Sequence, residues 1–372
     1  MSVELKPRYK QTEVGVIPED WDLDFIDNIA HITTGSKNTQ DREADGQYPF
    51  FVRSQTVERI NSYSFDGEAV LTAGDGVGTG KVFHYINGKF DAHQRVYRMS
   101  GFSERINGYY FYLYFSNHFY NRIMQMTAKS SVDSVRREMI AKMPIPLPPT
   151  KAEQEAIAEA LSDADALIES LEQLITKKRH IKQGAMQELL TGKKRLPEFS
   201  GEWEVKRLGD VLKVRHGKSQ HDIVLADGKY PILASGGEIG RTNDYLYDKP
   251  SVLIGRKGTI DVPQFIDTPF WTIDTLFFTE ISLDADTKFI FYKFNTINWR
   301  SYNEASGVPS LSASRIENID FNCPPLPEQT AIANILSDMD TEITALEAKL
   351  AKTRSLKQGM MHNLLTGRIR LL

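Results

Sequence analysis

Residues 151–196 read KAEQEAIAEALSDADALIESLEQLITKKRHIKQGAMQELLTGKKRL, and residues 328–371 read EQTAIANILSDMDTEITALEAKLAKTRSLKQGMMHNLLTGRIRL. A shift of 175 positions superposes the two stretches. It aligns LSD at Leu161 with LSD at Leu336, and both stretches later share KQG and LLTG. So many identities at a single offset indicate an internal repeat, and such a repeat determines how the rest of the fold is read.

Apolar residues recur every three or four positions along both stretches, which is the pattern of a coiled-coil heptad. The expected seam consists of Ile157, Leu161, Ile168, Leu171 and Ile175 in the first stretch and of Ile332, Leu336, Met339, Ile343, Leu346 and Leu350 in the second. The same step continues to Ile181 and Leu356. The Asp and Glu residues between these positions are expected on a solvated face.

Signals for the ends of two long helices flank this pattern. Thr150 with Glu153 predicts a capping box at the first N-terminus, and Gly192 and Gly367 predict the two C-terminal stops. A helix of about 40 residues is about 55–60 Å long at 1.5 Å per residue. Because one narrow apolar stripe cannot bury itself, we expect the two helices to pair antiparallel, with a pseudo-two-fold axis relating the halves.

The sequence before each helix also repeats, more faintly. At a shift of 182, Trp21 meets Trp203 and Gly76 meets Gly258. Nearer the helices a shift of 179 pairs Ser131 with Ser310 and Arg136 with Arg315, together with two Pro-Leu-Pro motifs. The chain therefore alternates globular and helical parts. The predicted domains are 1–145 (first globular domain), 146–197 (first long helix), 198–322 (second globular domain) and 323–372 (second long helix).

The globular parts are predicted to mix strands and helices, so the fold class is α+β. SVLIG at Ser251 and TLFFTEI at Thr275 are typical of strands, whereas residues 108–127, GYYFYLYFSNHFYNRIMQMT, favour a helix. We expect its aromatic residues to form core rather than a platform for stacking bases, because burial of aromatic rings dominates domain cores.

A glycine-rich stretch, TAGDGVGTGK at residues 72–81, raises the question of a phosphate-binding loop. A Walker loop would need glycine at the position of Asp75 and Ser or Thr at that of Val82. The flanking runs are strand-like, whereas phosphate-binding loops lead into a helix. We therefore predict a β-turn between two strands, and an enzyme acting through Lys81 is the weakest of the alternatives.

Composition excludes several classes of protein. The net charge is −4, no apolar run is long enough to span a membrane, and Cys323 is the only cysteine. MSVELKPRYK at the N-terminus lacks the apolar core of a signal peptide, so a cytoplasmic protein is expected. No metal site is predicted, because His84 and His93 lack a third ligand nearby in the sequence.

These residues resemble the specificity (S) subunit of type I restriction-modification systems over essentially the whole chain. The motifs that carry the resemblance are the domain openings at Gly15 and Glu202, the helix starts PLPPTKAEQ and PPLPEQTA, and the helix ends KQGAMQELLTG and KQGMMHNLLTG. The resemblance implies two target-recognition domains, each reading one half of a bipartite sequence in double-stranded DNA. It also implies helices that set the gap and dock two methyltransferase (M) subunits, with motor-nuclease (R) subunits joining for cleavage.

The same resemblance implies that the chain is not itself an enzyme and needs no cofactor. The sequence has no N-P-P-[FY] methylation motif and no Walker loop. Neither globular part has a surplus of Lys and Arg, so the isolated chain is expected to bind DNA weakly. A two-headed scaffold that binds proteins through its globular parts is the alternative, and heptads alone would favour a plain spacer.

Candidate DNA contacts are donors on loops, since Arg reads guanine and Gln or Asn reads adenine. In the first domain they are Arg53, Ser54, Gln55, Lys81, Gln94, Arg95, Ser131 and Arg136; in the second they are Lys218, Arg241, Arg256, Lys257, Ser310 and Arg315. The pairs that recur in both halves, Ser131 with Arg136 and Ser310 with Arg315, are expected to hold phosphate or to support the domain structure.

Overall fold

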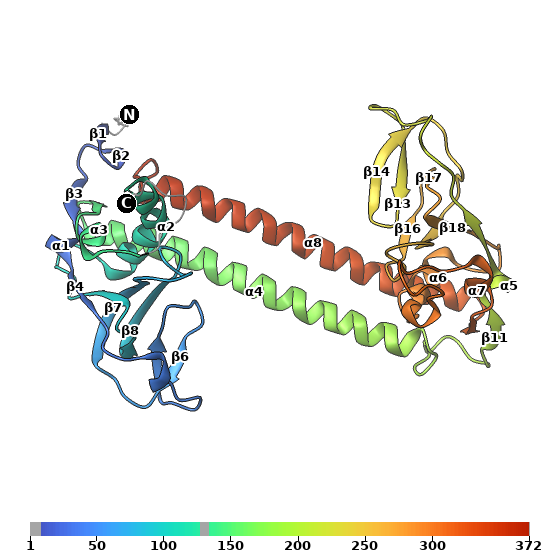
Figure 1. Cartoon of the computed structure of the whole chain (residues 1–372), viewed down its shortest axis with the longest axis horizontal. Coiled ribbons are helices and arrows are strands. Elements are labelled where there is room, and N and C mark those ends of the chain that lie inside the picture. The colour runs from blue at the N-terminus through green and yellow to red at the C-terminus, as the bar shows by residue number, and fades with distance from the viewer. Residues whose placement is uncertain (1–8, 127–133, 372) are drawn as a thin grey trace. The chain divides into compact units, whose positions relative to one another are not determined.

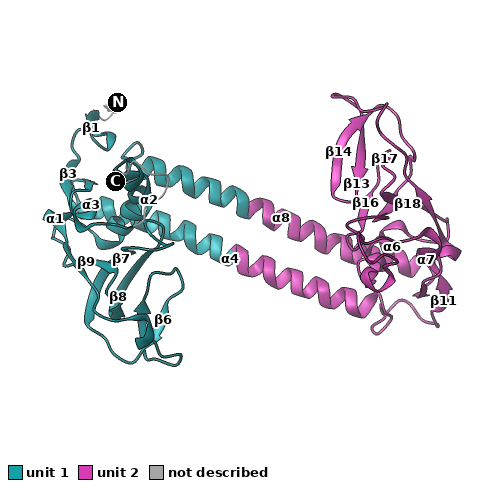
Figure 2. Cartoon of the chain, in the orientation of Figure 1, with its two compact units in different colours: residues 1–170, 350–372 teal, residues 171–349 magenta. Residues whose placement is uncertain are grey.

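The computed structural model describes residues 9–126 and 134–371, and the chain divides into two compact units (Figure 2). Unit 1 comprises Met1–Ser170 and Leu350–Leu372, and unit 2 comprises Leu171–Lys349. Each unit combines β-sheets, short helices and part of both long helices, which confirms the α+β class (Figure 1). No helix in the described ranges is long and apolar enough to cross a membrane.

Unit 1 is built on a six-stranded sheet in the order β4-β9-β7-β8-β5-β6. These strands are β4 (His31–Thr34), β5 (Tyr48–Phe51), β6 (Glu58–Ile60), β7 (Phe65–Ala73), β8 (Phe83–Ala92) and β9 (Val96–Ser100). Two antiparallel pairs flank it: β1 (Tyr9–Thr12) with β2 (Gly15–Pro18), and β3 (Asp22–Phe25) with β10 (Pro144–Leu147). The glycine-rich stretch connects β7 to β8, so it is the β-turn that the sequence predicts.

The aromatic helix of unit 1 is α2 (Gly108–Met126). Four aromatic side chains of this helix are fully buried in the main core cluster: Tyr110, Phe111, Phe115 and Phe119. The expectation that they are core residues is therefore confirmed. The short helices of this unit are α1 (Ile26–Ile29), α3 (Arg137–Ala141) and the 3-10 helix η1 (Thr39–Asp41).

Unit 2 repeats these elements with a smaller, divided sheet. Its strands are β11 (Glu204–Arg207), β12 (Leu212–His216), β13 (Tyr230–Ala234), β14 (Gly237–Thr242), β15 (Ser251–Gly255), β16 (Gln264–Ile266), β17 (Trp271–Thr272), β18 (Leu276–Ile281) and β19 (Asp320–Cys323). They form sheets in the orders β12-β18-β15-β16, β14-β13-β17 and β11-β19. The helices are α5 (Leu208–Val211), α6 (Thr287–Phe294), α7 (Ala313–Glu317) and η2 (Trp299–Tyr302).

Matching hydrogen bonds show that the two units share one backbone frame. The side chain of Asn61 accepts a hydrogen bond from the Gln47 backbone at 3.1 Å, and Asn243 accepts one from Lys229 at 3.1 Å. Both pairs follow the shift of 182 residues seen in the sequence. The weak similarity between the globular parts therefore reflects a true structural repeat.

The long helices are α4 (Lys151–Leu189) and α8 (Leu326–Leu364), of 39 residues each. Within unit 1, Lys357 of α8 pairs with Asp165 of α4, and within unit 2, Lys182 of α4 pairs with Asp340 of α8. Early residues of one helix thus meet late residues of the other, as an antiparallel pair requires. The two ion pairs are also equivalent under the shift of 175 residues.

The heptad seam is buried to different degrees along the helices. Ile157, Leu161, Leu171, Ile175, Ile332, Leu336 and Ile343 are buried, whereas Ile168, Met339, Leu346 and Leu350 are half-buried. The extension of the seam to Ile181 and Leu356 is wrong, because these side chains are 47% and 61% exposed. At these two places the following lysines, Lys182 and Lys357, turn inward to their aspartates instead.

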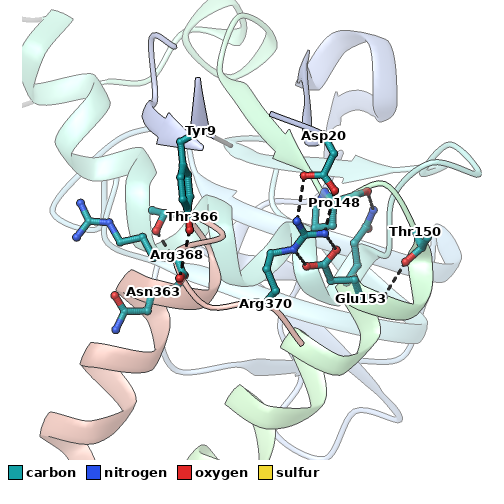
Figure 3. Close-up of polar contacts among 10 residues, drawn as sticks. Tyr9, Asp20, Pro148, Thr150, Glu153, Asn363, Thr366, Arg368 and Arg370 are labelled. Atoms are coloured by element: carbon teal, nitrogen blue, oxygen red, sulfur yellow. Dashed lines mark hydrogen bonds and ion pairs between the residues drawn. The ribbon is translucent and has the colours of Figure 1, made fainter. Parts of the chain in front are cut away.

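The start of α4 corrects another expectation, that the acidic residues of the long helices are solvated. Thr150 caps the helix by accepting a hydrogen bond from the Glu153 backbone at 3.2 Å. The Glu153 side chain is not the second half of a capping box: it is buried and pairs with Arg370, which also contacts Asp20 (Figure 3). The residues that follow α8 are thereby tied to the start of α4 within unit 1.

Unit 2 contains the equivalent contact between the other helix ends. Arg195, which follows α4, pairs with the fully buried Glu328 at the start of α8, with Nε–Oε1 at 2.6 Å. Trp203 donates a hydrogen bond from Nε1 to the same carboxylate at 3.0 Å. In each unit, a buried ion pair therefore connects the start of one long helix to the segment that follows the other. Heptad periodicity does not reveal these ion pairs.

Candidate nucleic-acid interface

The turn between β7 and β8 gathers the charged candidates of unit 1. Asp75 accepts a hydrogen bond from Arg53 Nη1 at 2.7 Å, and its second oxygen pairs with Arg95 Nη1. Burial alone would raise the pKa of the Asp75 carboxyl, but the hydrogen bonds and charges of the two arginines hold the pKa below its usual value of 3.8. Asp75 is therefore ionised at neutral pH and bridges two cations.

The neutral candidates of unit 1 lie around this turn. Ser54 and Gln55, which follow Arg53, are exposed, and the Ser54 carbonyl contacts the ring Nε2 of His84 at 3.0 Å. Burial lowers the pKa of His84, although its contact with that carbonyl opposes the shift. Gln94 donates a hydrogen bond to the side chain of Asn38 at 2.6 Å. The segments that carry these candidates are thus fixed by contacts of their own.

Lys81 lies at the far end of the glycine turn. Its ammonium is 5.3 Å from the centre of the Tyr120 ring on α2, in cation–π geometry. The segment after the turn is strand β8, so no helix N-terminus faces it. Lys81 is consequently an exposed cation that rests against α2.

In unit 2 the equivalent turn follows β15 and carries Arg256 and Lys257. The Arg256 backbone N–H donates to Thr275 at 2.8 Å, just as Gly74 donates to Arg95 at 2.8 Å in unit 1. Gly258 and Gly76 adopt φ of 86° and 81°, a conformation that favours glycine. The bend is therefore the same in both units, while the side chains on it differ.

Two other candidates of unit 2 have structural contacts. The guanidinium of Arg241 pairs with Glu238 at 2.9 Å and donates to the carbonyls of Gly228 and Lys229 at 3.4 and 3.5 Å. The backbone of Lys218 is bonded to Thr272 at 2.8 Å, and its side chain is exposed. Arg241 therefore holds the loop that carries Gly228 and Lys229.

Arg59 of unit 1 supports this view of Arg241. It occupies the equivalent position and donates to the carbonyls of Gly46 and Gln47 at 2.9 and 2.7 Å. The same loop is thus held by arginine in both units. Because both units repeat this contact between arginine and backbone carbonyls, a structural role accounts for Arg241 without a bound ligand.

The sequence register next to the helices needs correction. Isolated β-bridges join Asp75 to Ser134 and Lys257 to Ser310, so the structural equivalent of Ser310 is Ser134 rather than Ser131. The true shift here is 176, because β10 and β19 pair with β3 and β11 in matching registers. Three-residue identities such as Pro-Leu-Pro misled the alignment, since pairing of strands and not side-chain identity is what both units retain.

This correction separates the residues thought to recur. Ser131 lies outside the described residues. Arg136 is the N-cap residue of α3, whereas Ser312 holds that position in α7 and accepts a hydrogen bond from the Arg315 backbone. Arg315 is exposed and lies 5.9 Å over the ring of Tyr302. Arg136 and Arg315 are therefore not equivalent, and Ser310 is the described serine among these candidates that adjoins the turn of its unit.

Asp75 is the residue that sequence reasoning missed. In the sequence it stands out only as a mismatch to a phosphate-binding motif, because its position among four glycines does not show what it contacts. Its partners Arg53 and Arg95 lie 22 and 20 positions away, so no local pattern shows the cluster. Among the described residues, no group of three or more His, Cys, Asp or Glu is placed to hold a metal ion.

Known proteins are similar to this chain in sequence and in fold. It is 24% identical to the type I restriction enzyme EcoDI specificity subunit of Escherichia coli, over 95% of this chain and 90% of that protein. It is 26% identical to the putative type I restriction enzyme MjaX specificity subunit of Methanocaldococcus jannaschii, over 97% and 96%.

Solved structures agree on the fold. An S subunit of a type I restriction-modification system from M. genitalium superposes with a TM-score of 0.69 at 18% identity, covering 97% of this chain and 99% of that one. The family model of the type I restriction modification DNA specificity domain matches twice, at residues 18–178 and 200–353. The chain therefore belongs to the family of type I restriction-modification specificity proteins, with two copies of the family's domain.

Proposed function

We propose that this chain is the DNA-reading subunit of a type I restriction-modification complex. Residues 1–145 and 198–322 are the two recognition domains, and each reads one half of a bipartite target in double-stranded DNA. Residues 146–197 and 323–372 set the gap between the half-sites. The observation that carries the proposal is the shared backbone frame of the two turns, on which different charged side chains stand.

A repeated frame with unlike side chains suits two unlike half-sites. The backbone places the turn, and arginine, lysine or glutamine on it would contact base edges or phosphates. In the first domain we assign this role to Arg53, Ser54, Gln55, Lys81, Gln94, Arg95 and Arg136, and in the second to Lys218, Arg256, Lys257, Ser310 and Arg315. Arg241 is the weakest candidate because its guanidinium holds the Gly228–Lys229 loop.

We assign methyl transfer and cleavage to partner subunits. A chain with a TM-score of 0.55 and 14% identity, covering 95% of this chain and 99% of that one, comes from a study of complex assembly in a type I restriction-modification system. By analogy, two M subunits dock on the long helices and R subunits join the complex in the cytoplasm. A protein-binding scaffold is the alternative, and no contact among the described residues of either unit favours it.

The test is a map of methylated adenines in DNA from cells that express this chain with its cognate M subunit. We expect one split motif, with two unlike half-sites and a fixed gap. A matched culture that expresses the M subunit alone gives the background. If a verified M–S complex leaves DNA unmethylated at any split motif, the proposal is wrong and the scaffold becomes the better account.

A further inference from the structure

The alternating glycines of the β7–β8 turn have a structural cause. A Cβ atom at Gly74 would lie 2.9 Å from the Arg95 carbonyl oxygen, and one at Gly78 would lie 2.7 Å from the Arg53 carbonyl oxygen. Both distances are too short for real Cβ atoms. The glycines therefore let the turn sit between the two backbone segments that carry Arg53 and Arg95.

This placement puts the Asp75 carboxylate between the two guanidinium groups. The Asp75 side chain is 17% exposed, while those of Arg53 and Arg95 are 41% and 62% exposed. Each arginine uses one Nη1 on Asp75, out of the five N–H donors that a guanidinium carries. The acid is thus largely covered, and the two cations it holds present much of their surface to solvent.

Unit 2 has the opposite distribution of charge on the same frame. Lys257 stands at the position of Asp75, since each forms the β-bridge to its equivalent serine. The positions of Arg53 and Arg95 are taken there by Ser235 and Thr275. At these three positions unit 1 therefore has an acidic residue between two arginines, whereas unit 2 has a lysine with a serine and a threonine.

An acidic group beside DNA weakens the attraction of phosphates, so affinity alone does not explain Asp75. The orientation of the two arginines does explain Asp75. A contact with a carboxylate restricts the rotamers of a long side chain and fixes the plane of its guanidinium. A fixed plane is what a bidentate contact with guanine O6 and N7 requires.

We infer that Asp75 is a positioning residue that orients Arg53 and Arg95 toward guanine edges in the half-site read by residues 1–145. The inference rests on the proposed function, to which it adds the base that is read, guanine, and the residue that orients the arginines, Asp75. Val77, on the same turn, is fully exposed, and the side chains of Arg53 and Arg95 are themselves 41% and 62% exposed, so both guanidinium groups are accessible to a ligand.

The experiment compares the M–S complex of the unaltered chain with complexes carrying Asp75→Asn or Asp66→Asn. Asp66 is an exposed residue of β7, the strand that leads into the turn, so its substitution removes the same charge outside the arginine cluster. Two readouts are taken: the sequences methylated at each half-site, and the salt dependence of binding to DNA that lacks the target.

For Asp75→Asn we expect discrimination at guanine positions of the first half-site to fall about 5- to 150-fold, the equivalent of losing a bidentate contact worth about 1–3 kcal/mol. The second half-site and the gap stay unchanged. Binding to non-target DNA strengthens and its salt slope steepens by up to about one unit, because an acidic charge is lost near phosphate. Asp66→Asn leaves both half-sites as they are.

The outcomes separate the inference from the proposed function. If the unaltered complex methylates no split motif, the proposed function fails and the inference fails with it. If it does, and Asp75→Asn keeps full discrimination or the first half-site has no guanine, only the inference is overturned. Should Asp75→Asn prevent assembly, Arg53→Lys and Arg95→Lys keep the charge but lose the planar fork; guanine discrimination retained by both would overturn the inference.

Discussion

Removing the charge of Arg370 should open unit 1 selectively. Arg370 donates from Nη2 to Glu153 at 2.8 Å and reaches Asp20 at 3.0 and 3.1 Å. Its own side chain is 16% exposed and that of Glu153 is 2% exposed. Arg370→Met keeps most of the volume but leaves the Glu153 carboxylate buried without its cation.

The burial of Glu153 and Asp20 sets the expected cost of Arg370→Met in stability. Breaking a buried ion pair on one side costs about 3–5 kcal/mol, because the remaining charge has lost its compensation. Asp20 adds little, since its side chain is 53% exposed and an exposed pair contributes about 0–1 kcal/mol. At about 1.4 kcal/mol per factor of ten, the opening equilibrium of unit 1 should rise about 140- to 4,000-fold.

The equivalent substitution in unit 2, Arg195→Met, is the matched comparison. Glu328 keeps the hydrogen bond from Trp203 Nε1, whereas the buried Nε1 of Trp21 has no hydrogen-bond partner among the described residues. A hydrogen bond to a charged group contributes about 1.5–3 kcal/mol. Arg195→Met should therefore cost less than Arg370→Met by about that amount, and it should open unit 2 rather than unit 1.

Hydrogen exchange measured by mass spectrometry can locate each effect. Peptides from 151–170 and 350–371 report on unit 1, and peptides from 171–189 and 326–349 report on unit 2. Glu153→Gln combined with Arg370→Met should restore most of the protection, because neither charge remains buried. Less than tenfold faster exchange in unit 1 for Arg370→Met, or equal acceleration in both units, would refute the reasoning.

Three further predictions follow from the helices and the second turn. One heptad inserted into both helices, after Ser170 and after Lys349, lengthens each by about 10 Å at 1.5 Å per residue. The gap between the methylated half-sites should widen by about three base pairs, and an unchanged gap would show that the helices do not set it. Arg256→Ala should relax the second half-site alone in the methylation map, and relaxation of the first would reverse the assignment of domains. A double-mutant cycle on Lys182 and Asp340, whose side chains are 21% and 41% exposed, should give a coupling energy below about 1 kcal/mol by chemical denaturation, and a much larger value would show a buried pair.

Long-range periodicity and the internal repeat made the helices predictable from the sequence. Heptads and caps are local, so the lengths of α4 and α8 follow from residues within a few positions of one another, and their antiparallel pairing follows from the internal repeat of one narrow apolar stripe. The aromatic helix α2 and the turn after β7 were predictable for the same reason. The exposure of Ile181 and Leu356 was not, because it depends on lysines whose partners lie about 160–190 positions away.

The candidate interface was predictable only in part. Residue type and loop placement selected Arg53 and Arg95 individually, yet their connection through Asp75 needs the sheet to bring three separate segments together. Arg241 shows the opposite failure: an exposed arginine on a strand reads as a ligand contact until its bonds to backbone carbonyls are seen. The sequence register just before the long helices was also wrong by three positions, because short identities indicate a shift of 179 whereas strand pairing gives 176.

The composition of the two units has a consequence for synthesis of the protein. Unit 2 is one continuous segment, Leu171–Lys349, whereas unit 1 needs Leu350–Leu372 in addition to the first part of the chain. Domains generally fold as units while the chain emerges from the ribosome, the N-terminal ones first. Here that order is inverted: the second unit can complete its core first, and the first unit must wait, with part of its apolar surface uncovered, until residues 350–371 are made. A premature stop near the C-terminus would therefore damage the domain encoded first.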